Sequence, residues 1–150
     1  MLNLRNPLLL ERARARIENF NRQQLLLEDL FAHCDDRHIE IVWRPMRRAH
    51  GCSFYEQDEP FICINPLVSP AEQIIAGWHE YLHLVEHVPD VVTFSTGTFF
   101  NLSKMEYQAQ VIGVMALMPD PLVRWLNEEE IMGEFGVTQS IARFRLSLFR

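Results

Sequence analysis

The chain has 150 residues, with 14 basic and 20 acidic side chains and a net charge of −6 when its histidines are neutral. This length predicts one domain over residues 1–150 that buries its own core, and the negative charge argues against direct nucleic-acid binding. The chain has an odd number of cysteines without metal-site spacing, which predicts reduced thiols. It has no apolar run of membrane-spanning length and no signal-peptide pattern. We therefore expect a cytoplasmic protein without membrane association.

Two amphipathic helices are predicted first, because apolar residues recur at helical spacing over 7–20 and again over 23–33. Short strands follow at 39–43, 53–56 and 61–64, which are rich in β-branched and aromatic residues and are separated by turn residues. The expected fold class is α+β, with N-terminal helices and a small three-stranded sheet.

The next predicted helix contains the run His79-Glu80-Tyr81-Leu82-His83, an HExxH motif. A spacing of four residues places the two imidazoles on one helix face, about 6 Å apart along the axis, so both can reach one metal ion. Glu80 lies beside them and can take a proton from water without itself binding the metal. This arrangement is typical of a hydrolytic zinc site.

The start of this helix is predicted independently of the motif. Ser69, Pro70 and Glu72 provide an N-cap serine, a proline at the first helical position and a capping-box glutamate. The segment 74–85 is otherwise apolar, so burying the motif's ionisable groups there would cost several kcal/mol unless they were paired or ligated. The alternative is that both histidines lie at the edge of the core and are hydrogen-bonded to backbone and water.

A tetrahedral zinc site requires a third protein ligand. His87 would lie about 12 Å from His79 along the helix axis, so it is predicted as a rim residue and not as a ligand. Glu106 opens a second apolar helix, predicted over 105–118. Small residues recur on one face of that helix: Ala109, Gly113 and Ala116. They would let the two helices approach closely and make Glu106 the predicted third ligand, although Glu106 could instead close a capping box with Ser103.

The segment 88–100 is predicted as a loop rich in β-branched and aromatic residues, which could form a wall over a substrate cleft or pack as core. Residues 120–150 are predicted as a C-terminal helical subdomain, in which helices 128–135 and 139–149 flank a glycine turn and resemble a helix-turn-helix. The second helix carries Arg143, Arg145 and Arg150. Four glutamates in the first helix and an apolar stripe on the second favour a pair that packs on the core over a DNA-binding pair.

These motifs resemble the ImmA/IrrE metallopeptidase family. The matching features are HExxH followed by a hydrophobic residue, a Glu106-x-x-Ala109 helix that ends in Leu117-Met118-Pro119, and a hairpin that runs from Gly51 to Ile64-Asn65. The resemblance implies a zincin-like domain in which His79, His83 and Glu106 bind Zn²⁺ and Glu80 is the general base. It also implies a regulatory protease whose partner is a transcriptional repressor of the helix-turn-helix type, or a similar protein.

The chain departs from the family pattern inside and after the motif. Trp78, Tyr81 and Leu82 stand where the family usually has a small residue and Leu-Gly, and Gln110 replaces the asparagine that commonly follows E-x-x-A. The added bulk predicts an altered pocket shape and an unusual substrate preference. The predicted ligands and base are all retained.

Two functions of different class are consistent with the sequence. The first is a zinc-dependent intracellular endopeptidase, in which His87, Tyr81 or Tyr107 could help to stabilise the oxyanion. The second is a non-proteolytic regulatory binding module that contacts a repressor or DNA through its C-terminal helices. Glu80 favours the first, because a structural metal site has no use for a base at this position.

Overall fold

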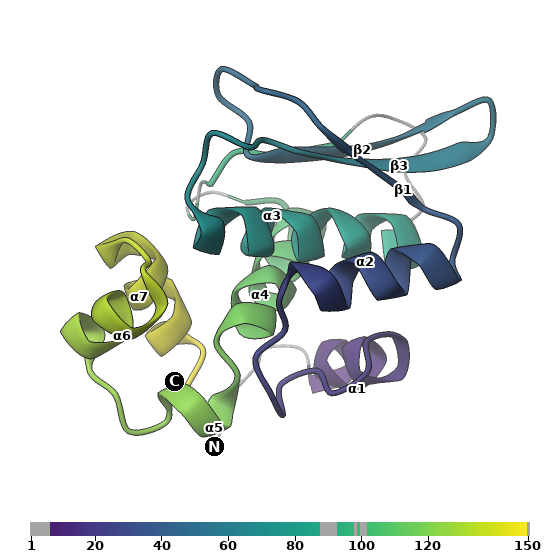
Figure 1. Cartoon of the computed structure of the whole chain (residues 1–150). Coiled ribbons are helices and arrows are strands. Elements are labelled where there is room, and N and C mark those ends of the chain that lie inside the picture. The colour runs from purple at the N-terminus through teal and green to yellow at the C-terminus, as the bar shows by residue number, and fades with distance from the viewer. Residues whose placement is uncertain (1–6, 88–92, 98, 100–101, 150) are drawn as a thin grey trace.

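The computed structural model of the chain describes residues 7–87, 93–97, 99 and 102–149. The helices are α1 (Pro7–Arg16), α2 (Leu27–Asp36), α3 (Pro70–Leu82), the π-helix η1 (His83–His87), α4 (Lys104–Leu117), α5 (Asp120–Val123), α6 (Glu128–Phe135) and α7 (Gln139–Ser147). The strands are β1 (Glu40–Trp43), β2 (Gly51–Glu56), β3 (Glu59–Ile64) and β4 (Thr93–Ser95). Figure 1 shows the sheet as one layer, with α3 and α2 beneath it and α5, α6 and α7 gathered at one end.

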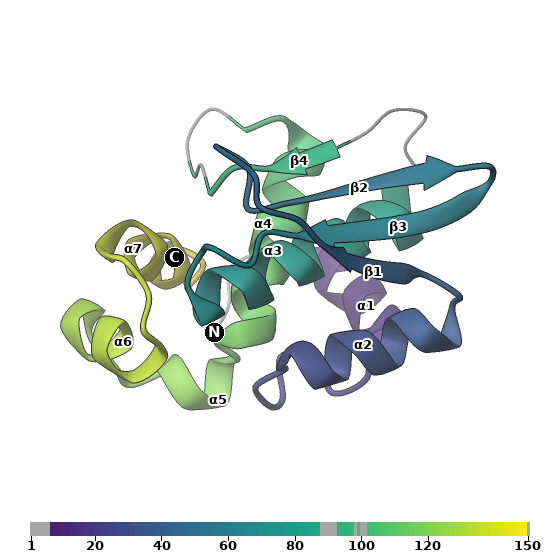
Figure 2. The ribbon, with the colours of Figure 1, turned by 45° about the horizontal axis from the view of Figure 1, so that its top comes forward.

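The sheet has the strand order β1-β3-β2-β4, which can be followed in Figure 2. The strands β2 and β3 form an antiparallel hairpin, while β1 runs parallel to β3. The predicted α+β class, with N-terminal helices, a small sheet and a C-terminal helical pair, is confirmed. The predicted number of three strands is too low, because β4 adds an antiparallel edge strand beside Gly51–Ser53 of β2. A strand of three residues is too short for its alternation to be recognised in the sequence.

The fourth strand falls inside the segment that was predicted as a loop. Val91, Val92 and Phe100 of that segment lie outside the described residues, as does the side chain of Phe94. Phe99 packs against Phe144 of α7, with ring centroids 5.0 Å apart. This part of the connection therefore links the sheet edge to the C-terminal helices.

The first helix is shorter than predicted and ends at Arg16. Asn19 and Asn21 both adopt the left-handed conformation, with φ of 62° and 60°, which asparagine tolerates better than most residues and which stops a helix. The Asn21 side chain donates to the Asp120 carboxylate at 3.0 Å and accepts from the Asp120 backbone N–H at 2.8 Å. This turn is thereby fixed to the start of α5.

The helix α3 begins at the predicted N-cap, Ser69, but the Glu72 carboxylate accepts from the Ser69 hydroxyl and does not form the predicted capping box. The Glu72 backbone N–H donates to Ser69 Oγ at 3.2 Å, the Ser69 hydroxyl donates to Glu72 Oε1 at 2.9 Å, and Pro70 occupies the first turn. From Ile74 to Leu82 every residue is buried. The helix therefore lies between the sheet and the other helices, with no face left to solvent over this stretch.

The small residues of α4 allow it to cross α3 at close range. A Cβ atom placed on Gly113 would lie 2.5 Å from the Ile75 backbone oxygen, closer than any real contact of this kind. Ala109 and Ala116 are fully buried on the same face. The predicted close approach of the two helices is confirmed, and its closest point involves backbone that has little freedom to move.

Replacing Gly113 with alanine is therefore expected to lower the free energy of unfolding by about 1–3 kcal/mol, because α3 and α4 must separate to admit the methyl group. The matched control is Gly133→Ala in α6, where no atom lies within 4 Å of the added Cβ. That change should stabilise the protein by about 0.5–1 kcal/mol through helix propensity alone. Chemical denaturation of both variants measures the contrast, and equal effects would show that α3 and α4 are not in backbone contact.

The C-terminal helices α6 and α7 pack on the rest of the molecule. Arg145 is fully buried, and its guanidinium donates to the Met118 backbone oxygen at 2.7 Å and to the Asp120 carboxylate at 2.6 Å. Arg143 pairs with Glu128 of α6 at 3.0 Å. Two of the arginines predicted on this helix are thus engaged within the molecule, which supports the packing interpretation of the pair. Among the described helices, none combines the length and the apolar character that crossing a bilayer requires.

Candidate metal centre

The crossing of α3 and α4 brings three predicted ligands together. His79 Nε2 and His83 Nε2 lie 3.2 Å apart, and the Glu106 carboxylate lies 3.0 Å from the first and 2.8 Å from the second, through different oxygens. Both imidazoles are buried, while the Glu106 side chain is 30% exposed. In the part of the chain that the structure describes, this is the one group of three such side chains whose ligand atoms converge.

These distances are close to those of a tetrahedral zinc site. Ligand bonds of 2.0–2.2 Å at tetrahedral angles place neighbouring ligand atoms about 3.3–3.6 Å apart, somewhat wider than the three distances here. Two imidazoles and one carboxylate also form a donor set that catalytic zinc commonly uses, and they leave a fourth position open. The residues present therefore fit a zinc ion.

The orientation of His79 is set by Gln110 of α4. The amide Oε1 of Gln110 lies 2.8 Å from His79 Nδ1 and accepts a hydrogen bond from its N–H, which leaves Nε2 facing the cluster as the available ligand atom. Burial lowers the pKa of His79, but the hydrogen bond to Glu106 and the charges of Glu80 and Glu106 outweigh it and raise that pKa above its ordinary value. The sequence marked Gln110 only as a departure from the family pattern, without a role.

The carboxylate of Glu106 faces the histidines because a different group caps the helix. The Glu106 backbone N–H donates to Ser103 Oγ at 3.2 Å, so Ser103 caps α4 without using the carboxylate. Burial raises the pKa of Glu106, but hydrogen bonds from His79 and His83 outweigh it and hold that pKa well below its usual range. The alternative prediction, that the Glu106 side chain closes a capping box with Ser103, is therefore not what the structure shows, and both carboxylate oxygens face the histidines.

The predicted base, Glu80, lies beside the cluster and is completely buried. Its Oε2 is 3.8 Å from His79 Nε2, and its Oε1 accepts a hydrogen bond of 2.8 Å from the Ser53 hydroxyl of β2. Ser53 is itself buried. The sequence did not identify Ser53, because no local pattern links a strand residue to a helix 27 positions later.

The residues predicted as oxyanion donors are placed differently. Tyr81 is fully buried on the far side of α3, where its ring meets His33 and Trp78 edge-on, so a role beside the scissile bond does not fit this position. Tyr107 packs against Phe144 of α7, with centroids 5.9 Å apart. The side chain of His87 lies outside the described part of the chain.

From His83 onwards the helix widens into η1, a five-residue π-helix. The sequence predicted uninterrupted α-helical spacing here. Glu86 of η1 is held by two arginines of α1, at 2.7 Å from Arg12 and 2.6 Å from Arg16. This ion-pair cluster fixes the turn that follows the second histidine, and π-helical turns are frequent at functional sites.

Replacing Gln110 with leucine is expected to weaken zinc binding by about 10- to 100-fold, because His79 loses the acceptor that orients its ring. Gln110→Glu retains an acceptor oxygen at the same position and should bind zinc at least as tightly as the unaltered protein. Competition against a chromophoric zinc chelator measures both affinities. An unchanged affinity in Gln110→Leu would mean that the contact does not position the ligand.

The comparisons with known proteins agree with this geometry. The family model described as IrrE N-terminal-like domain, peptidase M78, matches residues 34–147, a range that contains His79, Glu80, His83 and Glu106. The chain belongs to this family. No curated protein was found to match it. The resemblance to ImmA/IrrE metallopeptidases is thereby confirmed, and the IrrE-like chain is of a metallopeptidase type with a His-His-Glu group that could hold a metal.

A solved structure shares the fold. The chain is similar to a Mycobacterium tuberculosis transcriptional regulator, with a TM-score of 0.61 and 17% sequence identity. The similarity covers 95% of this chain and 47% of that protein, so the IrrE-like chain spans about half the length of its structural neighbour.

Proposed function

We propose that this IrrE-like chain is a zinc-dependent endopeptidase that acts inside the cell. The observation that carries the proposal is the convergence of His79 Nε2, His83 Nε2 and the Glu106 carboxylate, with the Glu80 carboxylate 3.8 Å from the first of these atoms. A base beside the ligands, and not among them, suits hydrolysis. Membership of a peptidase family supports the same conclusion.

In this mechanism His79, His83 and Glu106 hold the metal. When bound, zinc supplies a Lewis acid and lowers the pKa of water at its open position towards 7. Glu80 accepts a proton from the attacking water and then delivers it to the leaving amine. Ser53 fixes one oxygen of Glu80 by donating its hydroxyl hydrogen, which leaves the other oxygen turned towards the ligand cluster.

We propose a protein substrate, a transcriptional repressor of the helix-turn-helix type. The family resemblance supports this partner, and the structural neighbour is named a transcriptional regulator. The negative net charge and the internal contacts of Arg143 and Arg145 make direct DNA binding by this chain the weaker alternative.

The test uses the purified full chain and the repressor encoded nearest to its gene. We expect about one zinc ion per chain by elemental analysis, and cleavage of the repressor at a defined bond by mass spectrometry. A chelator should abolish cleavage and added zinc should restore it. Absence of stoichiometric zinc, or cleavage that persists in chelator, would contradict the proposal. Binding of the intact repressor without cleavage, equal with and without zinc, would instead support a regulatory binding module.

A further inference from the structure

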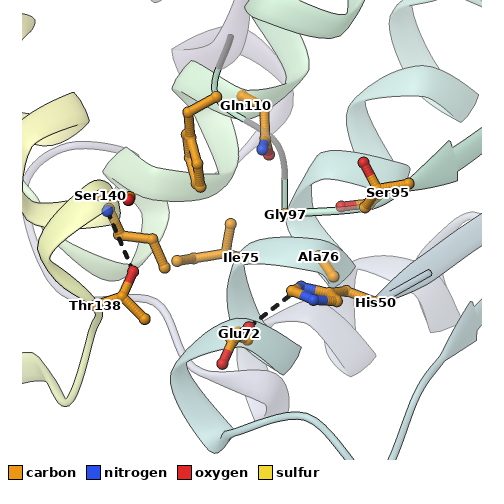
Figure 3. A pocket seen from close by; sticks show the side chains of 12 residues that line it. His50, Glu72, Ile75, Ala76, Ser95, Gly97, Gln110, Thr138 and Ser140 are labelled. Atoms are coloured by element: carbon orange, nitrogen blue, oxygen red, sulfur yellow. Dashed lines mark hydrogen bonds and ion pairs between the residues drawn. The ribbon is translucent and has the colours of Figure 1, made fainter. Parts of the chain in front are cut away.

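A cavity of about 280 Å³ lies beside the metal centre, between α3, β4, α4 and α7. Figure 3 shows Gln110 at one end of this cavity, with Glu72 and His50 at the other. Ser95 of β4 lines one side, and Thr138 at the start of α7 lines the opposite side. The cavity is therefore walled by four separate elements and has distinct ends.

One end of the cavity lies next to the metal centre, with Gln110 between the two. Gln110 lines the cavity and also accepts the hydrogen bond from His79 Nδ1. Glu72, Ile75 and His79 share one face of α3, because they lie three and four residues apart. The cavity thus extends from the metal centre towards the start of α3. Glu72 and His79 are seven positions apart, or about 10 Å along the helix axis.

The end of the cavity away from Gln110 contains a charged group, the Glu72 carboxylate. Glu72 is the one carboxylate among the lining residues that the structure describes, and its Oε2 lies 3.4 Å from His50 Nδ1. The Ser69 hydroxyl donates to the other oxygen, Oε1, which holds the carboxylate in place. Hydroxyl groups line the space between the two ends: Ser95, Thr96, Thr138 and Ser140.

Apolar side chains complete the walls. Ile75, Phe99 and Ile141 line the cavity and offer contact for a methylene chain. Gly97 adopts a φ of 73°, and a Cβ atom there would lie 2.5 Å from His50 Cε1. The loop after β4 thus closes directly on the His50 ring, and only glycine permits this approach.

We propose that this cavity binds a lysine or arginine side chain of the substrate next to the scissile bond, with Glu72 as the residue that determines specificity. A long side chain that enters from the metal centre would lay its methylene groups on the apolar wall and place its cationic head at Glu72. An acidic side chain would be repelled by the Glu72 carboxylate. An aliphatic side chain would offer no hydrogen-bond donor to the carboxylate or to the hydroxyl groups, so both should bind more weakly. The inference rests on the proposed function of the neighbouring centre.

The first experiment measures binding without cleavage. The full chain with added zinc is titrated with Nα-acetyl-arginine methylamide, and the backbone amide shifts of Ser95 and Gly97 are followed by NMR. We expect saturable shifts at these residues. The corresponding leucine and glutamate derivatives should bind more weakly than the arginine derivative. In Glu72→Gln the dissociation constant of the arginine derivative should rise about tenfold. Glutamine keeps an acceptor oxygen for the Ser69 hydroxyl and the backbone N–H that Ser69 caps. The matched control, Glu129→Gln on the exposed face of α6, should change nothing.

The second experiment measures cleavage of a peptide library randomised around a fixed centre. We expect lysine and arginine to be enriched at one position beside the cleaved bond. This enrichment should be lost in Glu72→Gln and retained in the control Glu129→Gln. Cleavage without a basic preference, or an equal affinity for the glutamate methylamide, would overturn the pocket and leave the peptidase function standing. Arginine binding in the cavity with no cleavage of any peptide would support the pocket and contradict the peptidase function.

Discussion

Glu80→Gln should reduce peptide hydrolysis by a factor on the order of 10²–10⁴ while zinc content stays at the level of the unaltered protein. The amide has nearly the shape of the carboxylate but cannot accept the proton of the attacking water. Because Glu80 lies beside the ligand atoms and not among them, its replacement removes the base and leaves His79, His83 and Glu106 in place. Rates on the repressor or on a peptide substrate, measured with the zinc content of the same sample, give the result.

The control for this change is a glutamate outside the site. Glu134→Gln on α6 alters the same chemical group at an exposed position and should leave hydrolysis unchanged. If Glu80→Gln cleaves as fast as this control, another residue supplies the base, and the hydrogen bond from Ser53 to Glu80 has only a structural role.

Glu106→Ala should lower zinc affinity by more than the 10- to 100-fold loss that is typical when an outer partner of a ligand is removed. Two imidazoles would remain, and a site with two protein ligands holds zinc poorly. Loss of the carboxylate also removes the group that faces both ring nitrogens, at 3.0 Å and 2.8 Å. Dialysis against buffered zinc followed by elemental analysis measures the change.

The variant Ser103→Ala separates the proposed role of the Glu106 carboxylate in zinc binding from the capping of α4. It removes the hydroxyl that accepts from the Glu106 backbone N–H, and should cost about 1 kcal/mol of stability without altering zinc affinity. Full zinc binding in Glu106→Ala would move the third ligand to another side chain. A large loss of zinc in Ser103→Ala would mean that the start of α4, and not the carboxylate alone, determines binding.

The helix-borne part of the site was predictable because its signals are local. The spacing of His79 and His83 places them on one face, and the cap of Ser69 fixes where α3 begins. Gly113 indicated which face of α4 approaches α3, and this predicted that Glu106 would reach the histidines. These features follow from helical periodicity, which the sequence displays directly.

The remaining parts depend on contacts between segments that are distant in the sequence. The pairing of β4 with β2, the hydrogen bond from Ser53 to Glu80 and the ion pair of Arg145 with Asp120 each join residues 25 or more positions apart. The sequence did not distinguish Arg145 from the other arginines of the C-terminal helix. Burial of its guanidinium depends on Asp120 and Met118, which the helical pattern of α7 does not reveal.

The ion pairs of Arg12 and Arg16 with Glu86 indicate how far the folding unit extends towards the N-terminus. The family match begins at residue 34, after α1 and most of α2. Yet Glu86 follows the second histidine by three residues, and Leu25 donates its backbone N–H to Ala116 of α4. A protein trimmed to the matched range would leave the Glu86 carboxylate without its partners and would uncover the core beside α4. The cooperative unit is thus broader than the range by which the family is recognised, because α1 and the segment that leads into α2 support the candidate metal centre.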